Sequence, residues 1–300
     1  VGLRKNLVLY TALFALYTNG YVNSREIVTI ERNEMVAAVA RENFRRLGAE
    51  NIEVVCSSAE EYLAHCEEHF DWIYVDPDRR TDKGERVFKL EDCSPNVLAL
   101  MPHIKRVGEH LAIKNSPLFD VEEAFRLFAG CGVEVISLGG ECKEVMIYVD
   151  GSTPRLAAEA VDVGRYEVSR EEALKATLSS HDFAAEEYRY LIVPDVALQK
   201  ARLVQHSLRG KADVWSNNSF GFARELPEGV LGRVERIERI EIFDIKSLKR
   251  ELKGKGVDIV LRDFPMGVDE LRKRTASRSG NEKRIALTRI AGKSYTIYLA

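Results

Sequence analysis

Disulfide and metal-binding patterns are missing from this chain of 300 residues. Its five cysteines are odd in number and show no C-x-x-C spacing, which argues against a disulfide framework and a zinc site. His65 and His69 lie four residues apart, a spacing that can bind metal, but the intervening Glu67 and Glu68 favour a solvated helix end. We therefore predict no metal site, and free thiols suit a cytoplasmic protein.

Long hydrophobic runs are also missing. The apolar stretch Leu7–Tyr17 follows Arg4 and Lys5 in the manner of a signal peptide, yet no small-x-small cleavage site comes after it. It is shorter than the roughly 20 apolar residues that cross a bilayer. We expect neither export nor a membrane partner. The chain contains no P-loop, nucleophile elbow or H-E-x-x-H motif, so kinase and hydrolase functions have little support.

Charge is unevenly distributed along the sequence. The net charge of −3 conceals a basic segment, residues 246–300, with 14 Lys and Arg against 6 Asp and Glu. Such a segment predicts a surface for a polyanion such as RNA, or a solvated face of a charged domain. With 45% apolar and 30% charged residues, the chain is typical of two folded, soluble domains.

The first half alternates apolar runs with helical patterns, which predicts an α/β fold with a mainly parallel sheet. The four residues 139–142, which join the last two runs, are too few for a crossover helix, so these two strands must be antiparallel. The predicted elements are Ile27–Glu31, Met35–Leu47, Ile52–Cys56, Ala59–Cys66, Trp72–Asp76, Pro95–Val107, His110–Lys114, Val121–Ala129, Val133–Leu138 and Glu144–Val149.

A turn at 151–154 divides the chain into a first domain, 1–150, and a second, 151–300. Within the second, we expect a helical linker region over 151–232 and a smaller α+β part over 233–300. The linker region has helical patterns at Arg170–Ser180 and Val196–Leu208. The α+β elements are Val234–Phe243, Ile245–Leu252, Val257–Leu261, Val268–Lys273, Lys283–Ile290 and Tyr295–Leu299.

Two predicted strands end in acidic residues. Glu31 ends the first, where a carboxylate can accept both hydroxyls of a ribose, or simply complement the start of a helix. Ser58 and Ala59 follow the next strand, where Ser58 can bind an adenine amine or cap the following helix. These three residues are candidate cofactor ligands.

Asp76 and Pro77 follow the second acidic strand. A side-chain oxygen of Asp76 and the carbonyl of Pro77 can accept the hydrogens of an amine and aim its lone pair, an effect of orientation. An Asp-Pro turn without function is the alternative. Arg79 and Arg80 come next and suit phosphate contacts or surface ion pairs. Lys114 ends another strand and can meet a phosphate or a cofactor carboxylate, or lie on the surface.

These segments together resemble bacterial class I S-adenosylmethionine-dependent methyltransferases that carry a THUMP-like C-terminal domain. The resemblance rests on the runs 27–34, 71–80, 87–93, 114–118, 140–144, 257–265 and 268–274, in that order. It implies a Rossmann-like sheet that ends in an antiparallel hairpin, followed by an α+β THUMP-like domain. It also implies S-adenosylmethionine at Glu31, Ser58, Ala59 and Asp76, a target pocket at Asp76 and Pro77, and RNA, such as tRNA or rRNA, as substrate.

The amino end departs from that family. A glycine-rich turn is expected 15 to 20 residues before Glu31, but no glycine lies between Gly2 and Gly20. We therefore expect residues 1–26 to differ from the native family sequence, through truncation, frameshift or degeneration. If the turn is truly lost, the central strand is replaced or absent and activity is in doubt. Two functions follow from this: an RNA methyltransferase, or an inactive RNA-binding or interaction protein on the same scaffold. The missing turn and the closing hairpin weaken a third, a nicotinamide oxidoreductase.

Overall fold

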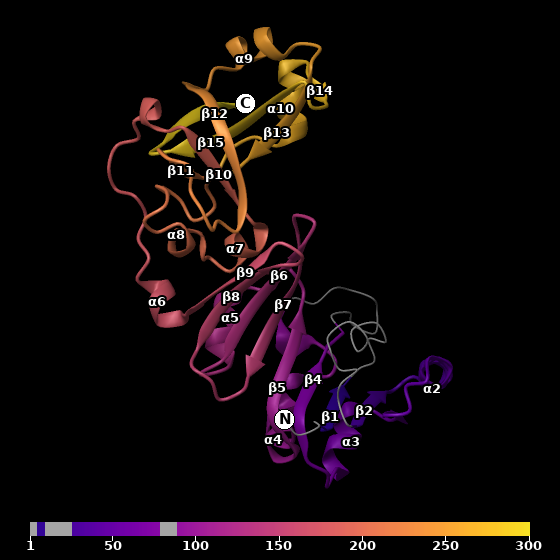
Figure 1. Ribbon diagram of the computed structural model, residues 1–300. Coiled ribbons are helices and arrows are strands. Elements are labelled where there is room, and N and C mark those ends of the chain that lie inside the picture. Colours follow the sequence, from indigo (N-terminus) through magenta and orange to yellow (C-terminus); the bar gives the residue numbers. More distant parts are fainter. Residues whose placement is uncertain (1–4, 10–25, 79–88) are drawn as a thin grey trace. The chain divides into compact units, whose positions relative to one another are not determined.

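A computed structural model of the protein describes residues 5–9, 26–78 and 89–300 (Figure 1). The chain clusters into two compact units. The first consists of residues 1–136 and 143–155, and the second of residues 137–142 and 156–300. None of the helices in the described ranges is both long enough and apolar enough to cross a membrane.

The strands of the first unit lie in the order β3-β2-β1-β4-β5-β7-β6, seven of the nine strands of one sheet. Strands β1 to β5 are parallel, and β7 pairs with β5 antiparallel. The predicted α/β fold with a mainly parallel sheet is therefore confirmed. The strands are β1 (Lys5–Leu9), β2 (Glu26–Glu31), β3 (Ile52–Cys56), β4 (Phe70–Val75), β5 (Gly108–Asn115), β6 (Gly132–Leu138) and β7 (Glu141–Val149).

The central position of the sheet is occupied by β1, so the alternative that the central strand is absent is wrong. It lies between β2 and β4 and forms parallel ladders with both. Leu7, Val8 and Leu9 are buried because the strand has neighbours on both sides. Residues 10–25, where the glycine-rich turn is expected, lie outside the described residues.

Helix α2 (Glu34–Leu47) shows why the helices form where they do. The side chain of Asn33 caps its start by accepting from the amides of Met35 and Val36. Gly48, with a left-handed backbone (φ 68°), ends it. The apolar stripe of Ala37, Ala40 and Phe44 packs against residues of β1, β2 and β3. The other helices of this unit are α3 (Ala59–His65), η2 (Leu90–Asp92), α4 (Val97–Val107) and α5 (Val121–Leu127).

Strands β6 and β7 form the predicted closing hairpin. Gly139 and Gly140 connect them, with φ of 61° and 80°. A two-residue turn with both φ positive matches the twist of antiparallel strands and favours glycine at both positions. The hairpin therefore returns the chain to pair with β5 in the opposite direction.

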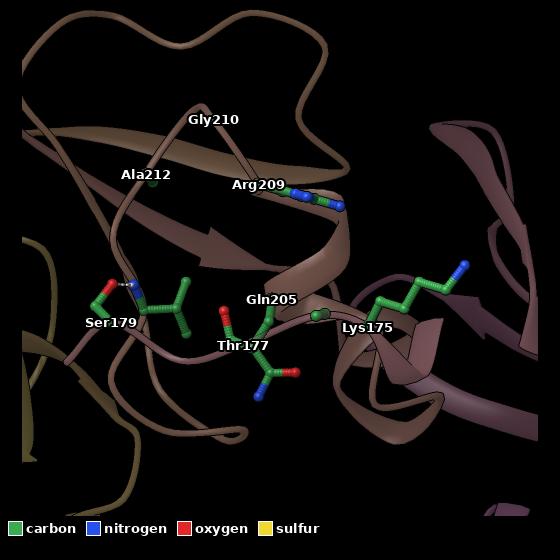
Figure 2. Close-up of a pocket in the computed structure, with 9 residues that line it drawn as sticks. Lys175, Thr177, Ser179, Gln205, Arg209, Gly210 and Ala212 are labelled. Atoms are coloured by element: carbon green, nitrogen blue, oxygen red, sulfur yellow. Dashed lines mark hydrogen bonds between the residues drawn. The ribbon is translucent and has the colours of Figure 1, made fainter. Parts of the chain in front are cut away.

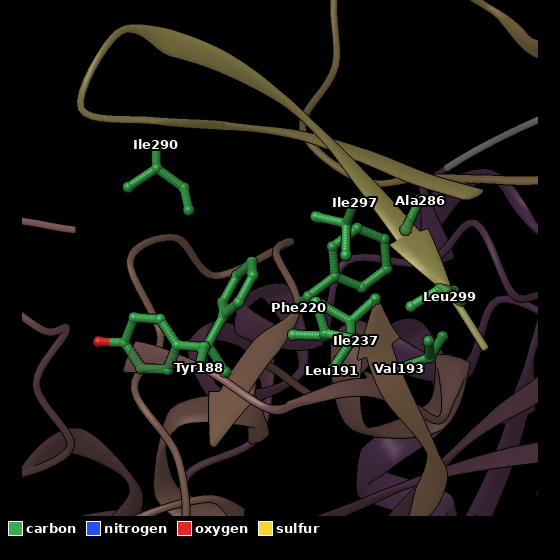
Figure 3. Packing of buried hydrophobic residues seen from close by; sticks show 10 residues of the cluster. Tyr188, Leu191, Val193, Phe220, Ile237, Ala286, Ile290, Ile297 and Leu299 are labelled. Carbon is green, nitrogen blue, oxygen red and sulfur yellow. The ribbon is translucent and has the colours of Figure 1, made fainter. Parts of the chain in front are cut away.

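The second unit contains a seven-stranded sheet with the order β11-β10-β12-β16-β15-β13-β14. One face of this sheet carries an aromatic and aliphatic cluster that includes Tyr188, Phe220 and Ile297 (Figure 3). Helices α9 and α10 pack on the other face, around Leu248 and Leu271 (Figure 1). The strands are β10 (Tyr190–Pro194), β11 (Gly221–Ala223), β12 (Gly232–Ile242), β13 (Gly256–Leu261), β14 (Arg278–Ser279), β15 (Lys283–Ile290) and β16 (Lys293–Leu299), and the helices are α9 (Ile245–Leu252) and α10 (Val268–Thr275).

The segment predicted as a helical linker differs from the prediction. It contains strands β8 (Arg155–Ala160) and β9 (Gly164–Ser169), besides β10 and β11. Its helices are short: α6 (Arg170–Leu174), η3 (Ala185–Glu187), α7 (Val196–Lys200) and α8 (Val204–Ser207). The helix predicted over Val196–Leu208 is broken because Arg202 has a left-handed backbone, with φ 58°.

Candidate active site at the strand ends

The predicted site residues gather at one edge of the first sheet. Glu31 ends β2, Ser58 and Ala59 follow β3, Asp76 follows β4, and Lys114 lies near the end of β5. These strands are parallel neighbours or are separated only by β1, so their carboxyl ends share an edge, the place where α/β sheets bind ligands. Arg79 and Arg80 lie outside the described residues.

Glu31 is buried, with 4% of its surface exposed. Its Oε1 accepts a hydrogen bond of 2.8 Å from the backbone amide of Asn33. Within the described part of the chain, Oε2 accepts none. The carboxylate is therefore fixed through one oxygen and keeps an acceptor for another donor.

A small pocket of about 60 Å³ lies at the ends of β2 and β3, and the residues on either side of Glu31 in the sequence, Ile30 and Arg32, are part of its wall. Ser58 and Ala59 are part of its wall. The Oγ of Ser58 accepts from the amide of Glu61 at 3.1 Å, so it caps α3, as one of the two interpretations predicts. The pocket is lined by Ile30, Arg32, Ser57, Ser58, Ala59, Glu60, Ser94 and Pro95.

Asp76 forms an ion pair with Lys114. The Nζ of Lys114 donates to Oδ2 of Asp76 at 2.8 Å, and their side chains are 27% and 16% exposed. The structure thus places Lys114 against Asp76 rather than apart from it. The ion pair uses only Oδ2 of Asp76, and Oδ1 has no partner among the described residues. Glu31 is likewise held through one oxygen. Pro77 is buried directly after Asp76.

The turn after Asp76 is tied to the pocket wall. Asp78 donates from its amide to the carbonyl of Ser94 at 2.7 Å, and the amide of Ser94 donates back at 3.0 Å. Because Ser94 and Pro95 line the pocket beside Ser58, this bridge joins the Asp76 turn to the pocket.

Glu144 on β7 is a site residue that sequence reasoning did not select. Burial raises the pKa of its carboxyl; Lys114 opposes this shift and the charge of Asp76 adds to it. In the ladder of β5 and β7, Asn115 faces Val145, so Glu144 lies just beyond the paired end of β5. Two carboxylates therefore lie within electrostatic reach of one lysine. Glu144 belongs to the run 140–144, one of the segments on which the family resemblance rests. Membership of that run is the feature of the sequence that points to Glu144.

A larger pocket of about 160 Å³ lies in the second unit (Figure 2). Lys175 and Arg209 contribute the charges of its wall, but Lys175 is neutralised by Glu171 at 2.9 Å and Glu172 at 2.6 Å. All the residues that line this pocket belong to the second unit. Across residues 5–9, 26–78 and 89–300, no group of three or more His, Cys, Asp or Glu is placed to hold a metal ion.

Comparison with known proteins supports this organisation. Residues 232–300 match the family model described as THUMP domain-like, which confirms the predicted THUMP-like end of the chain. A crystal structure of a putative methyltransferase from Porphyromonas gingivalis W83 is 24% identical and superposes with a TM-score of 0.85. The match covers 99% of this chain and 77% of that one, so the two proteins share a fold.

Two curated relatives, from the Mycobacterium tuberculosis strains CDC 1551 / Oshkosh and ATCC 25618 / H37Rv, are named as S-adenosylmethionine-dependent methyltransferases. Each is 25% identical to this chain over 231 residues, which cover 74% of this chain. The chain spans 61% of the length of these relatives. The names of the relatives agree with the family resemblance that the sequence motifs indicate.

Proposed function

We propose that this chain is an S-adenosylmethionine-dependent methyltransferase that modifies an amine of a nucleic acid, RNA, in the cytoplasm. One observation carries the proposal. Two carboxylates at the ends of parallel strands, Glu31 and Asp76, are each held through one oxygen while the other has no partner among the described residues. Such oxygens are ready to accept hydrogen bonds from ligands.

The cofactor side of the proposal rests on Glu31 and the adjoining pocket. Its Oε2 accepts the ribose hydroxyls in charge-assisted hydrogen bonds. Ser58 and Ala59 border the adenine, and the Oγ of Ser58 does so while it caps α3. Ile30 and Arg32, which flank Glu31 on its strand, line this pocket together with Ser58 and Ala59, and this supports the placement of the cofactor at this edge of the sheet. When bound, S-adenosylmethionine supplies a methyl group on a positively charged sulfur, which leaves as a neutral thioether.

The target side rests on Asp76 and Pro77. Oδ1 of Asp76 and the carbonyl of Pro77 accept the amine hydrogens and direct the nitrogen lone pair toward the methyl group. Lys114 holds Asp76 through Oδ2 and so fixes the direction of Oδ1. Arg79, Arg80 and the basic segment 246–300 contact phosphates of the RNA.

Calorimetric titration of S-adenosylmethionine, and of its demethylated product, tests the cofactor side. We expect micromolar binding that Glu31→Ala abolishes and Glu31→Gln weakens at least tenfold, because the ribose loses a charged acceptor. Glu34→Ala removes an exposed carboxylate three residues away and is the matched control, with unchanged affinity.

Equal affinity of Glu31→Ala and the unaltered chain would contradict the assignment of Glu31. Failure of a folded protein to bind either molecule would instead favour an inactive RNA-binding protein on the same scaffold. Methyl transfer from radiolabelled cofactor to total tRNA or rRNA then tests the substrate.

A further inference from the structure

The outward face of α9 carries a row of four cations. Lys246, Lys249, Arg250 and Lys253 are all exposed. The spacing of i, i+3 and i+4 places the first three on one side of α9, and Lys253 follows directly as the residue that caps the end of the helix. We call these four residues the α9 row.

The opposite face of the helix fixes this orientation. Leu248 and Leu252 are buried, with 1% and 0% of their surface exposed. They pack with Val257 of β13, Leu271 of α10 and Ile285 of β15 in one apolar cluster. The helix cannot rotate about its axis without exposing these leucines, so the four cations face solvent in the folded domain.

The carboxylates closest in sequence are engaged elsewhere. Asp244 caps α9 by accepting from the amides of Lys246 and Ser247, at 3.4 and 2.8 Å. Glu251 accepts two hydrogen bonds of 2.8 Å from Arg239. In the part of the chain that the structure describes, no carboxylate oxygen lies within 4.0 Å of a side-chain nitrogen of the α9 row. Its charge is therefore not neutralised locally.

Neighbouring cations of the same domain behave differently. On α10, Arg274 pairs with Glu270 at 2.6 Å and Arg272 with Asp269 at 3.8 Å. Arg284 on β15 pairs with Glu235 at 2.9 Å. Within residues 246–300, carboxylates therefore neutralise part of the positive charge on α10 and β15. The positive charge on the outer side of α9 has no such partner among the described residues.

We propose that the α9 row binds the phosphate backbone of RNA, with one phosphate for each cation at most. The choice of RNA as the polyanion rests on the proposed function. Cations on a flexible stem contact phosphates without reading the base, so this surface holds the substrate and leaves base selection to the target site. The site lies wholly within the second unit.

The test is fluorescence anisotropy of the full chain with a labelled 20-nucleotide oligouridylate, across a range of salt concentrations. The variant K246Q/K249Q/R250Q/K253Q is expected to bind at least tenfold more weakly. Each lost phosphate contact lowers the slope of log affinity against log salt by about 0.7 on single strands, or about 2.8 for four contacts.

A charge-matched control separates a local surface from total charge. R45Q/R46Q/R165Q/K175Q removes four exposed cations that are paired with Glu42, Glu159, Glu167, Glu171 or Glu172. We expect this control to lose less than threefold in affinity. Equal losses in the two variants, or no loss in the α9 variant, would overturn the proposal.

The result for RNA binding can be interpreted separately from the result for cofactor binding. If the unaltered chain binds S-adenosylmethionine but not the RNA, the α9 proposal fails while methyl transfer to another substrate stands. If it binds RNA through the α9 row but not the cofactor, the α9 proposal stands and the enzyme assignment fails. Preferential binding of polyglutamate over the RNA would replace RNA by an acidic protein partner and overturn the proposal.

Discussion

Two aspartates, one in each unit, accept a hydrogen bond of 2.8 Å from a basic side chain, yet their surroundings differ. In the first unit, Asp76 pairs with Lys114 through a single oxygen. In the second, Asp213 pairs with Arg224, and other side chains complete its bonding. A structural carboxylate therefore differs from one that is available to a ligand in how many of its oxygens are already bonded.

Asp213 uses both of its oxygens. The hydroxyl of Tyr188 donates to Oδ2 at 3.0 Å, and that of Ser179 donates to Oδ1 at 3.2 Å. Arg224 is itself fixed by Glu187, at 2.7 and 2.9 Å. Burial opposes ionisation of Asp213, but these donors prevail and its pKa lies below the ordinary value. A carboxylate with this many partners stabilises the fold.

Replacing Asp213 should have the largest effect on stability. Tyr188 is 2% exposed and stacks on Phe183, so Asp213→Ala leaves its buried hydroxyl without this acceptor and removes one of the two carboxylates that hold Arg224. We expect a loss of about 3 kcal/mol in the free energy of unfolding. Urea unfolding followed by Trp215 fluorescence in a Trp72→Phe background measures it, because Trp215 packs against Phe183 and then is the only tryptophan.

The control for this measurement is Asp182→Ala, an exposed aspartate in the same segment, with an expected change below about 0.5 kcal/mol. A loss for Asp213→Ala no larger than that of the control would show that the bonding around Asp213 contributes nothing to stability.

Asp150 shows whether a carboxylate is structural because its oxygens are all hydrogen-bonded or because it lies in the second unit. It lies in the first unit, and Arg155 donates to it at 2.8 Å, while the amide of Ser152 donates at 3.1 Å. Arg155 is the main cause that lowers the pKa of Asp150 well below its usual range; burial opposes the shift, and Ser152 adds to it. Asp150→Asn should therefore cost about 2 kcal/mol at pH 7.

The pH dependence of that cost follows from the sign of the shift. A lowered folded-state pKa means that the unfolded chain binds the proton more tightly, so the contribution is present above the unfolded value near 3.8 and is lost as the pH falls through the folded value. Unfolding at pH 7, 5 and 3 should show the same difference between Asp150→Asn and the unaltered chain at pH 7 and 5, and a smaller difference at pH 3. A constant difference would contradict the ion pair as its source.

The sequence predicted elements well where periodicity alone decides them. Ile245–Leu252 and Lys283–Ile290 agree with α9 and β15 at both ends, because apolar spacing and caps are local. Strand β1 was not predicted, since five residues that begin Lys5-Asn6 carry no alternation, and pairing with β2 and β4 determines their conformation. Strand-end residues could be found by sequence, because parallel strands bring their carboxyl ends to one edge.

Side-chain contacts between residues on different strands could not be predicted from the sequence. The link between Asp76 and Lys114 joins residues 38 positions apart, and it depends on β4 and β5 being neighbours. Glu144 reaches the same group only through the antiparallel register of β7 on β5. Register between distant strands follows from packing of the whole sheet, which single-sequence patterns do not encode.

Asp76 should show the smallest effect on stability. In Asp76→Ala, Lys114 keeps Glu144 as a nearby opposite charge. Burial is the main cause of the raised pKa of Glu144, and removal of Asp76 takes away the repulsion that adds to it. We expect unfolding, followed by Trp72 fluorescence in a Trp215→Phe background, to change by less than about 1 kcal/mol. Methyl transfer, if the proposed function holds, should fall by about 100-fold, because the target amine loses its acceptor. A destabilisation comparable with that of Asp213→Ala would make Asp76 a structural residue and remove the difference between the two aspartates.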